Sequence, residues 1–334
     1  MLEADVEVDR REFRLSAAIG VAAGERLALF GPSGAGKTTI LEAIAGLVQP
    51  RRGTVVLNGR VLTRTAAPRH QVPPWQRRVG LLRQDPALFP HLSVRQNLAY
   101  APAPGTGREE IARIAERLGL RGTLDDLPAR LSGGQAHRVA LGRLLASRCD
   151  ALLLDEPYAG LDAGLRRDLT ELVRELVAAR QVPSVLVAHE LEAAQAFADR
   201  MAVLDRGEIL QLASPAQVVA APAARRVAEL VGYRSFVLVP ETGAGVVAGV
   251  HPDRVVAGRQ PGRGVVLAGP VRSCRPSGAG WEASVEAAGT LVPVRLPDPP
   301  EPAAGEPDFV FTVLDPPCFG PDGLRVSRPE EVPT

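Results

Sequence analysis

Short, uninterrupted apolar runs recur along the first two thirds of the chain. Residues 27–30, 151–154 and 185–188 are three such runs. Runs of this length without polar alternation are typical of strands that are buried on both faces of a parallel sheet. Between the runs, apolar residues recur at helical spacing, as in residues 111–118, which Gly119 follows. This alternation of strands and helices predicts an α/β domain.

The pattern changes near residue 235, where glycine and proline become dense and the apolar runs become short and rich in valine. Residues 265–267, 291–294 and 309–311 are such runs, and residues 281–286 partly alternate between polar and apolar side chains. Several short strands separated by turn residues are typical of a small β barrel or sandwich. We therefore expect an all-β domain at the end of the chain.

Length and charge restrict the number of domains and the kinds of partner. A chain of 334 residues accommodates about two domains, and we place them at residues 1–233 and 234–334. The 46% hydrophobic content is ordinary for a globular protein with a sizeable core. The net charge of +1 provides no basic field for a nucleic acid, so no nucleic-acid partner is expected.

The N-terminal residues lack the positive and apolar regions of a signal peptide, and no apolar run approaches the roughly 18–20 residues of a membrane-spanning helix. The chain is therefore expected not to cross a membrane itself. Its three cysteines, Cys149, Cys274 and Cys318, are odd in number and far apart. They form neither a metal-binding spacing nor a disulfide framework, which favours a reducing cytoplasm.

The chain has 39 Lys and Arg residues, and Lys37 is the only lysine among them. It lies in the string Gly31-Pro32-Ser33-Gly34-Ala35-Gly36-Lys37-Thr38, which fits the phosphate-binding pattern G-x-x-x-x-G-K-[ST]. Glycines let successive backbone N–H groups turn towards phosphate oxygens, and the following helix adds its positive N-terminal end. An ammonium on a thin stem fits between β- and γ-phosphates better than a planar guanidinium does. We expect Thr38 to offer its hydroxyl to Mg²⁺ and Thr39 to face the α-phosphate.

Two further strings carry candidate chemistry. Asp155 and Glu156 follow the apolar run 151–154, which places Asp155 near a metal and lets Glu156 polarise an attacking water. The second string is Leu131-Ser132-Gly133-Gly134-Gln135. Ser132 can cap a helix whose first turn has bare glycine N–H groups, and such a turn is an anion site that a second chain's γ-phosphate can approach closely.

Together these strings resemble the motifs of the ATP-binding cassette family, over about residues 1–230. Gln84 matches the Q-loop of that family, and His189, after an apolar run, matches its switch histidine. Residues 159–162, which end in Asp162, match its D-loop. Phe13 is the candidate for an aromatic side chain that stacks on adenine, and a core phenylalanine is the alternative.

The resemblance implies a P-loop NTPase cassette with a RecA-like core sheet and a helical signature subdomain at about residues 86–146. A small all-β domain, similar to OB or TOBE domains, is expected to follow. The resemblance also implies cofactors, ATP and Mg²⁺, and roles for single residues. Glu156 would be the general base and Asp155 would hold Mg²⁺ through water. Gln84 would sense the metal and the attacking water, and His189 would contact the γ-phosphate.

The same resemblance implies a second copy of the chain. In this family the signature string faces the phosphate loop of a partner, so that two ATP molecules are held between two cassettes. The nucleotide-binding residues would then include Ser132, Gly133, Gly134, Gln135 and Asp162. Arg83, before the glutamine, and Glu190, after the histidine, depart from the commoner residues of the family without touching an expected phosphate-binding position.

The chain carries one cassette, and 131 − 84 = 47 residues separate Gln84 from Leu131, without sustained heptads. This organisation is similar to the separate ATPase subunit of an importer or of a split exporter. Such a subunit lies on the cytoplasmic side of a bacterial membrane as a peripheral protein. Its partners would be integral membrane permease subunits and, indirectly, an extracytoplasmic solute-binding protein.

The cargo is indicated by weaker resemblances. Residues 249–255 look like a segment of the regulatory β domain of importer ATPases for oxyanions, sugars, polyamines and iron. Residues 72–80 and 87–98 are most similar to the ATPase subunits of molybdate importers. Molybdate or tungstate is therefore the expected cargo. The alternatives are sulfate, iron(III), polyamine or sugar import, or a soluble cassette regulator with a ligand-sensing β domain.

Overall fold

The computed structural model describes residues 1–11, 13–100, 103, 107–158, 161–239, 245–260, 264–278, 280–301 and 308–326. The chain divides into two compact units, Met1–Pro215 and Ala216–Thr334. This division lies earlier in the chain than the boundary that the change in composition suggests, so that helix α8 (Arg225–Leu230) and most of helix α7 (Pro215–Ala220) belong to the second unit.

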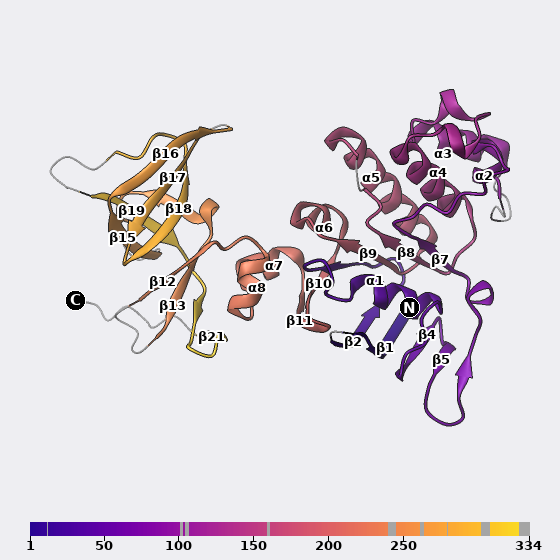
Figure 1. The fold of residues 1–334 in the computed structure, drawn as a ribbon, viewed down its shortest axis with the longest axis horizontal. Helices are drawn as coiled ribbons and strands as arrows, with labels where there is room; N and C mark the ends of the chain where they lie inside the picture. Colours follow the sequence, from indigo (N-terminus) through magenta and orange to yellow (C-terminus); the bar gives the residue numbers. More distant parts are fainter. Residues whose placement is uncertain are drawn as a thin grey trace. The chain divides into compact units, whose positions relative to one another are not determined.

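Unit 1 is built on an eleven-stranded mixed sheet with the order β6-β5-β4-β1-β2-β11-β10-β3-β9-β8-β7 (Figure 1). Its strands are β1 (Leu2–Asp9), β2 (Arg14–Val21), β3 (Arg26–Phe30), β4 (Arg52–Leu57), β5 (Arg60–Arg64), β6 (His70–Gln71), β7 (Val79–Leu82), β8 (Ala151–Asp155), β9 (Ser184–Ala188), β10 (Arg200–Asp205) and β11 (Glu208–Ala213).

The three apolar runs of the sequence, β3, β9 and β8, are neighbouring parallel strands towards the β7 end of this sheet. β3 pairs in parallel with β9 and β10, and β8 pairs in parallel with β7 and β9. Every residue of β8 and β9 is buried, as is expected of strands covered on both faces. The prediction of an α/β fold with a buried parallel sheet is confirmed.

The remaining strands are largely antiparallel, and β1 and β2 show the alternation of buried and exposed residues that is typical of strands with one buried face. β1 alternates strictly between buried and outward-facing residues, and it pairs with β2 and β4. Leu2, Ala4, Val6 and Val8 face the core, which they share with the apolar face of helix α1 (Lys37–Ala45). This antiparallel region therefore packs against the helix that follows the glycine-rich string.

The other helices of unit 1 are α2 (Val94–Leu98), α3 (Arg108–Arg117), α4 (Gly133–Ala146), α5 (Ala163–Arg180) and α6 (Leu191–Phe197). Short 3₁₀ turns lie at Pro74–Gln76, Arg121–Thr123 and Pro128–Arg130. α2, α3 and α4 gather into one group, away from β1, β2, β4 and β5 (Figure 1). Gly142 allows this close packing, because a Cβ atom there would lie 2.5 Å from side-chain atoms of both Leu98 and Leu118.

A buried arginine anchors the far end of α1. The Arg77 side chain is 1% exposed and donates hydrogen bonds to the backbone oxygens of Ala43 and Ile44 in the last turn of the helix, at 3.2 and 2.8 Å. It also donates to the Val72 carbonyl and to the Thr63 hydroxyl, both at 2.8 Å. Burial lowers the pKa of Arg77. A cation at a helix C-terminus is favourable, so Arg77 fixes α1 against the β5 side of the sheet.

In its described residues, unit 2 is all-β apart from α7, α8 and a short 3₁₀ turn, as the sequence predicted. These residues form three small sheets, with the orders β12-β13-β20-β21, β14-β19-β15 and β16-β17-β18. The strands are β12 (Ser235–Leu238), β13 (Val247–Val250), β14 (Val255–Ala257), β15 (Gly264–Gly269), β16 (Val271–Ser277), β17 (Gly280–Ala287), β18 (Thr290–Leu296), β19 (Phe309–Leu314), β20 (Cys318–Phe319) and β21 (Arg325–Val326). A core of mostly valine and phenylalanine side chains joins them.

The segment 249–255 forms the end of β13, a 3₁₀ turn at Pro252–Arg254 and the start of β14. His251 caps this turn through a hydrogen bond from the Asp253 backbone N–H at 3.3 Å, and its ring lies edge-on to Tyr233. Burial lowers the pKa of His251. The segment is thus an ordered turn between two strands. In neither unit is any helix of the described residues long and apolar enough to span a membrane.

Candidate functional site

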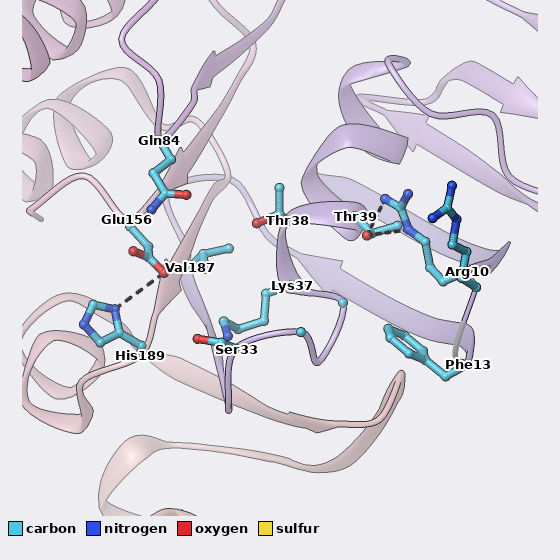
Figure 2. A pocket seen from close by; sticks show the side chains of 13 residues that line it. Arg10, Phe13, Ser33, Lys37, Thr38, Thr39, Gln84, Glu156, Val187 and His189 are labelled. Carbon is cyan, nitrogen blue, oxygen red and sulfur yellow. Dashed lines mark hydrogen bonds and ion pairs between the residues drawn. The ribbon is translucent and has the colours of Figure 1, made fainter.

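The candidate residues follow four neighbouring strands at one edge of the sheet. In the order β3, β9, β8 and β7, these strands are followed by the glycine-rich loop, His189, Glu156 and Gln84. Parallel strands have their carboxyl ends on the same side, and ligands of open α/β sheets bind there. The order of the sheet therefore brings together residues that are up to about 150 positions apart in sequence (Figure 2).

The loop from Gly31 to Gly36 has the backbone that the phosphate-binding pattern requires. Gly31, Gly34 and Gly36 all have positive φ angles, of 153°, 82° and 104°. A Cβ atom on Gly31 would lie 2.1 Å from the Leu204 carbonyl oxygen, so no other residue fits there. Gly36 provides no side-chain cap to α1, which leaves backbone N–H groups at the start of that helix available to an anion.

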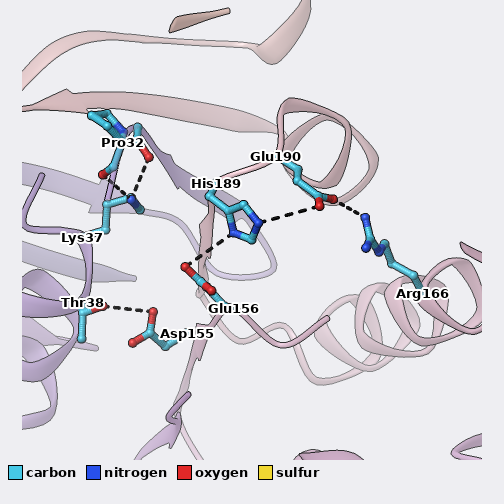
Figure 3. A network of polar contacts seen from close by, with 9 residues as sticks. Pro32, Lys37, Thr38, Asp155, Glu156, Arg166, His189 and Glu190 are labelled. Carbon is cyan, nitrogen blue, oxygen red and sulfur yellow. Dashed lines mark hydrogen bonds and ion pairs between the residues drawn. The ribbon is translucent and has the colours of Figure 1, made fainter. Parts of the chain in front are cut away.

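Lys37 is 6% exposed and lies across this loop (Figure 3). Its ammonium donates hydrogen bonds to the carbonyl oxygens of Gly31 and Pro32, both at 2.8 Å. Burial lowers the pKa of Lys37, and the nearby carboxylates of Glu156 and Asp155 oppose that shift. The lysine is therefore a buried cation with two acidic neighbours, at the position where the sequence predicts phosphate contact.

Asp155 is the last residue of β8 and is 5% exposed. The Thr38 hydroxyl donates a hydrogen bond to its carboxylate at 3.2 Å (Figure 3). Burial raises the pKa of Asp155, the hydrogen bond from Thr38 lowers it, and the negative charge of Glu156 raises it again. Thr38 and Asp155 thus place a hydroxyl and a carboxylate side by side below the loop.

Glu156 has a left-handed backbone conformation, with φ of 49°, which is rare for a residue with a long side chain and is found preferentially at functional sites. Its Oε1 atom lies 3.5 Å from Nδ1 of His189. Nε2 of the same imidazole lies 3.7 Å from Oε1 of Glu190, and Glu190 forms an ion pair with Arg166. His189 therefore lies between two carboxylates (Figure 3), and Arg166 fixes the second of them.

A cavity of about 610 Å³ opens over these side chains (Figure 2). Its volume falls in the range of small-molecule sites. It is lined by Arg10, Arg11, Phe13, Ser33, Gly34, Gly36, Lys37, Thr38, Thr39, Gln84, Glu156, Val187 and His189.

Phe13 forms part of one wall, where it is half-buried. Its ring packs over Gly36 and Gly207, and a Cβ atom on Gly207 would lie 2.5 Å from it. Phe13 also packs against the core of unit 1. Phe13 thus contributes to the core and also lines the cavity, and its stacking on adenine stays a prediction.

The signature string lies outside the cavity. Ser132 caps α4 by accepting a hydrogen bond from the Gln135 backbone N–H at 3.2 Å, and the Gln135 side chain accepts one from Ser132 at 2.8 Å. A Cβ atom on Gly133 would meet nothing within 4 Å, and one on Gly134 only the Leu161 side chain at 3.9 Å. Packing within this chain therefore does not explain the two glycines. They leave the first turn of α4 without side chains, and Gly133 is exposed.

The predicted D-loop is covered only in part, since residues 159 and 160 lie outside the described residues. Asp162 is described, and it caps α5 by accepting a hydrogen bond from the Leu165 backbone N–H at 3.0 Å. Like Ser132, it does not line the cavity of its own chain. Thus the residues predicted to act on the partner's nucleotide are separate from those predicted to act on the chain's own nucleotide.

Comparison with known proteins assigns this arrangement to a family. The ABC transporter family model matches residues 16–159. The Fe(3+) ions import ATP-binding protein FbpC 1 of Rhodococcus jostii is 37% identical over 275 residues, which cover 80% of this chain and 77% of that protein. The chain belongs to the ABC transporter family.

Other members of the ABC family give similar matches. The molybdenum import ATP-binding protein ModC of Mycobacterium tuberculosis strain H37Rv is 44% identical over 228 residues, which cover 66% of this chain but only 62% of the length of ModC. A solved dimeric ABC cassette, in a post-hydrolysis state bound to ADP and Pi, aligns with a TM-score of 0.55 and 25% identity, over 64% of this chain and 99% of that one. The predicted P-loop cassette fold is confirmed.

The donor set fits the Mg²⁺ ion that this family's nucleotide implies. Mg²⁺ prefers oxygen ligands, keeps several waters and usually takes one or two protein groups together with substrate phosphates. Thr38 and Asp155 provide such oxygens beside the phosphate loop. Among the described residues there is no group of three or more His, Cys, Asp or Glu side chains that could hold a metal by itself. The arrangement therefore suits a metal that arrives with a nucleotide.

Two features of the site were missed in the sequence. Arg10 lines the cavity beside Thr39, and Arg166 holds Glu190 against His189. In a chain whose basic residues are almost all arginine, neither arginine carries a local signal. The position of Arg10 directly after β1 and a few residues before Phe13 was the one available indication.

Proposed function

We propose that the chain is the ATP-hydrolysing subunit of a solute importer, and that it acts as a dimer docked on a membrane permease. The observation that supports this most directly is the cavity at the carboxyl edge of the sheet. It is lined by a glycine-rich anion loop, a buried lysine, the Thr38 hydroxyl and a carboxylate–imidazole pair, and the Thr38 hydroxyl donates to the Asp155 carboxylate behind it. Such a set can bind a triphosphate and activate a water molecule.

In this proposal the loop N–H groups and Lys37 bind the β- and γ-phosphates, and Lys37 exchanges its two carbonyl partners for phosphate oxygens. Thr38 and Asp155 hold Mg²⁺, which neutralises charge on the phosphates when it is bound. Glu156 accepts the proton of the attacking water. His189, fixed on its other side by Glu190, orients that water and contacts the γ-phosphate. Gln84 lines the same cavity and senses the γ-phosphate and the metal.

Dimerisation is supported by the exposed N-terminus of α4. The glycines of the signature string are not needed for packing within this chain, and the helix end they leave bare attracts anions. A second copy that presents its phosphate loop there would complete two sites at once. This symmetric arrangement is consistent with an isologous dimer.

A cysteine cross-link tests the dimer. In a background with the exposed Cys274 changed to Ser, the double substitution Ser33→Cys and Ser132→Cys should give a covalent dimer under mild oxidation when ATP is supplied without Mg²⁺. Each single substitution should give almost none. The product is measured by non-reducing electrophoresis. A double variant that binds ATP but stays monomeric at every protein concentration would contradict the head-to-tail dimer.

Docking on a permease is supported by a second cavity, of about 280 Å³, on the other side of the Gln84 segment. Arg83 and Asp85 line this second cavity, whereas Gln84 between them lines the nucleotide cavity. Phe89 forms part of the wall, and the Arg143 guanidinium lies 4.9 Å from the centre of its ring. We propose that this cavity receives a helix of the permease, so that one short segment contacts both the nucleotide and the permease.

For the cargo we propose molybdate or tungstate. The proposal is supported by the sequence of residues 72–98 and by the ModC protein, which is 44% identical. Proteins named for other cargoes are nearly as similar: the sulfate/thiosulfate import protein CysA 2 of Chromobacterium violaceum is 41% identical over 220 residues. The cassette itself does not discriminate between them, because cargo is bound by the permease and the solute-binding protein.

Metal content of cells tests the cargo. Deletion of the gene should lower cellular molybdenum severalfold at limiting molybdate, measured by mass spectrometry of washed cells, while iron and sulfur contents stay unchanged. Excess molybdate in the medium should restore the wild-type content. A deletion strain with normal molybdenum but low iron or low sulfate uptake would move the assignment to that cargo.

A further inference from the structure

We propose that Arg10 positions the Thr39 hydroxyl as a hydrogen-bond donor to an α-phosphate oxygen of the bound nucleotide. This inference rests on the proposed function, because it assumes that the cavity binds a nucleoside triphosphate. It adds a role for a residue that directly follows strand β1, on the side of the cavity where Phe13 also lies.

Arg10 contacts Thr39 directly through two hydrogen bonds. Arg10 donates to the Thr39 hydroxyl oxygen from Nη2 at 2.6 Å and from Nε at 3.0 Å (Figure 2). Thr39 lies in the first turn of α1 and is 6% exposed, and both residues line the nucleotide cavity. The guanidinium therefore fixes the orientation of a buried hydroxyl next to the phosphate loop.

The chemistry of the two groups determines where the hydroxyl proton points. A guanidinium only donates, so the Thr39 oxygen serves as acceptor for both bonds and its own O–H proton remains available. A buried threonine in a helix commonly gives this proton to the carbonyl four residues earlier. Thr170 does so in this chain, donating to the Arg166 carbonyl at 2.8 Å. Among the described residues Thr39 has no such acceptor, and an anion in the cavity is the group that its proton suits.

The surrounding charges favour an anion at this point. Glu42 lies 3.5 Å from Arg10 and 3.7 Å from Arg83, so that one carboxylate is shared by two guanidinium groups. The cluster therefore has one surplus positive charge. The Arg10 side chain is 37% exposed, and Arg11 also lines the cavity. The proposed function assigns Lys37 to the β- and γ-phosphates, so the phosphate left for the Arg10–Thr39 pair is the α-phosphate.

Nucleotide binding to the full-length chain tests the assignment. Arg10→Ala should raise the Kd by about tenfold for ATP, ADP and GTP alike, since a lost charge-assisted contact is of that size and does not depend on the base. The two diastereomers of ATP with sulfur on the α-phosphate provide a sharper readout, measured in EDTA so that no metal contributes. Wild-type protein should prefer one diastereomer, and Arg10→Ala should lose most of that preference. A general loss of structure would weaken both diastereomers equally and leave their ratio unchanged.

A double-mutant cycle then tests the connection through Thr39. If Arg10 acts through this hydroxyl, Arg10→Ala combined with Thr39→Ala should weaken ATP binding much less than the product of the two single effects. Arg14→Ala is the matched control, because Arg14 is exposed, is paired with Asp9 at 3.1 Å and does not line the cavity. It should leave every Kd unchanged.

Three results would overturn the inference: an unchanged Kd in Arg10→Ala, a diastereomer preference that persists in that variant, or independent effects in the cycle. In each of them wild-type protein still binds ATP, so the proposed function is unaffected. Absence of ATP binding by the wild-type chain would instead refute the proposed function.

Discussion

Changing Glu156 to Gln is expected to lower the rate of ATP hydrolysis by about 10²- to 10⁴-fold, the range for loss of a general base. Glutamine keeps the size of the side chain and its place beside His189, whose Nδ1 lies 3.5 Å from Oε1 of Glu156. It cannot accept a proton from water. Because the phosphate loop and Lys37 are untouched, ATP binding should be preserved. The variant should therefore accumulate in the state that precedes hydrolysis.

That state should be visible as an ATP-dependent dimer. With Mg²⁺ and ATP, Glu156→Gln should elute from gel filtration as a dimer, whereas wild-type protein under the same conditions returns to monomer as it hydrolyses the nucleotide. Glu192→Gln is a suitable control, since Glu192 is an exposed residue near the start of α6 that does not line the cavity. A Glu156→Gln variant that turns over ATP at the wild-type rate would refute the assignment of the general base.

Residues placed at strand ends were predictable from the sequence because two rules act together. The apolar runs before Gly31, Asp155 and His189 identified buried parallel strands, and such strands end on the same side of a sheet. The local patterns then supplied the chemistry at each end. For this reason the sequence alone predicts that these residues lie together at one side of the sheet.

Arginine contacts could not be predicted in the same way. Arg10 and Arg77 act over 29 and 34 residues of sequence, through bonds to Thr39 and Ala43. Apart from the position of Arg10 shortly before Phe13, nothing in their neighbourhood distinguishes them from the other arginines. A guanidinium forms whichever contacts the tertiary structure offers. Only the folded chain shows that Arg77 is buried at the end of α1, and that Arg10 reaches the beginning of the same helix.

The position of the unit boundary also depends on tertiary contacts that the sequence composition does not reveal. Composition changes near residue 235, where the β-rich sequence begins, but the contacts divide the chain at Pro215 and Ala216. The reason is that α8 and Tyr233 pack with the second unit: the Tyr233 hydroxyl donates to the Val219 carbonyl at 2.9 Å, and the Arg225 backbone N–H bonds to Gly323 at 2.8 Å. A helix can belong to a β unit without sharing its composition.

The single lysine leads to the second large effect. Lys37→Arg is expected to abolish measurable hydrolysis and to weaken ATP binding at least about tenfold, although it preserves the positive charge. The residue is 6% exposed, and its ammonium lies between two loop carbonyl oxygens at 2.8 Å each, which leaves little room for a larger cation on the loop side. A guanidinium is broader, planar and forked, and it would displace the loop that binds the phosphates.

The comparison between Lys37→Arg and Lys37→Ala shows which property matters. If the site needed only a charge, Lys37→Arg would resemble wild-type protein, and only Lys37→Ala would fail. We expect the two variants to have similarly low affinity for ATP, measured by fluorescence titration, because the shape of the cation is what fits the loop. Arg51→Lys is the matched exchange at the surface, where the side chain is 53% exposed and paired with Asp9, and it should change nothing. A Lys37→Arg variant with wild-type hydrolysis would show that the loop tolerates arginine, and the lone lysine would then need another explanation.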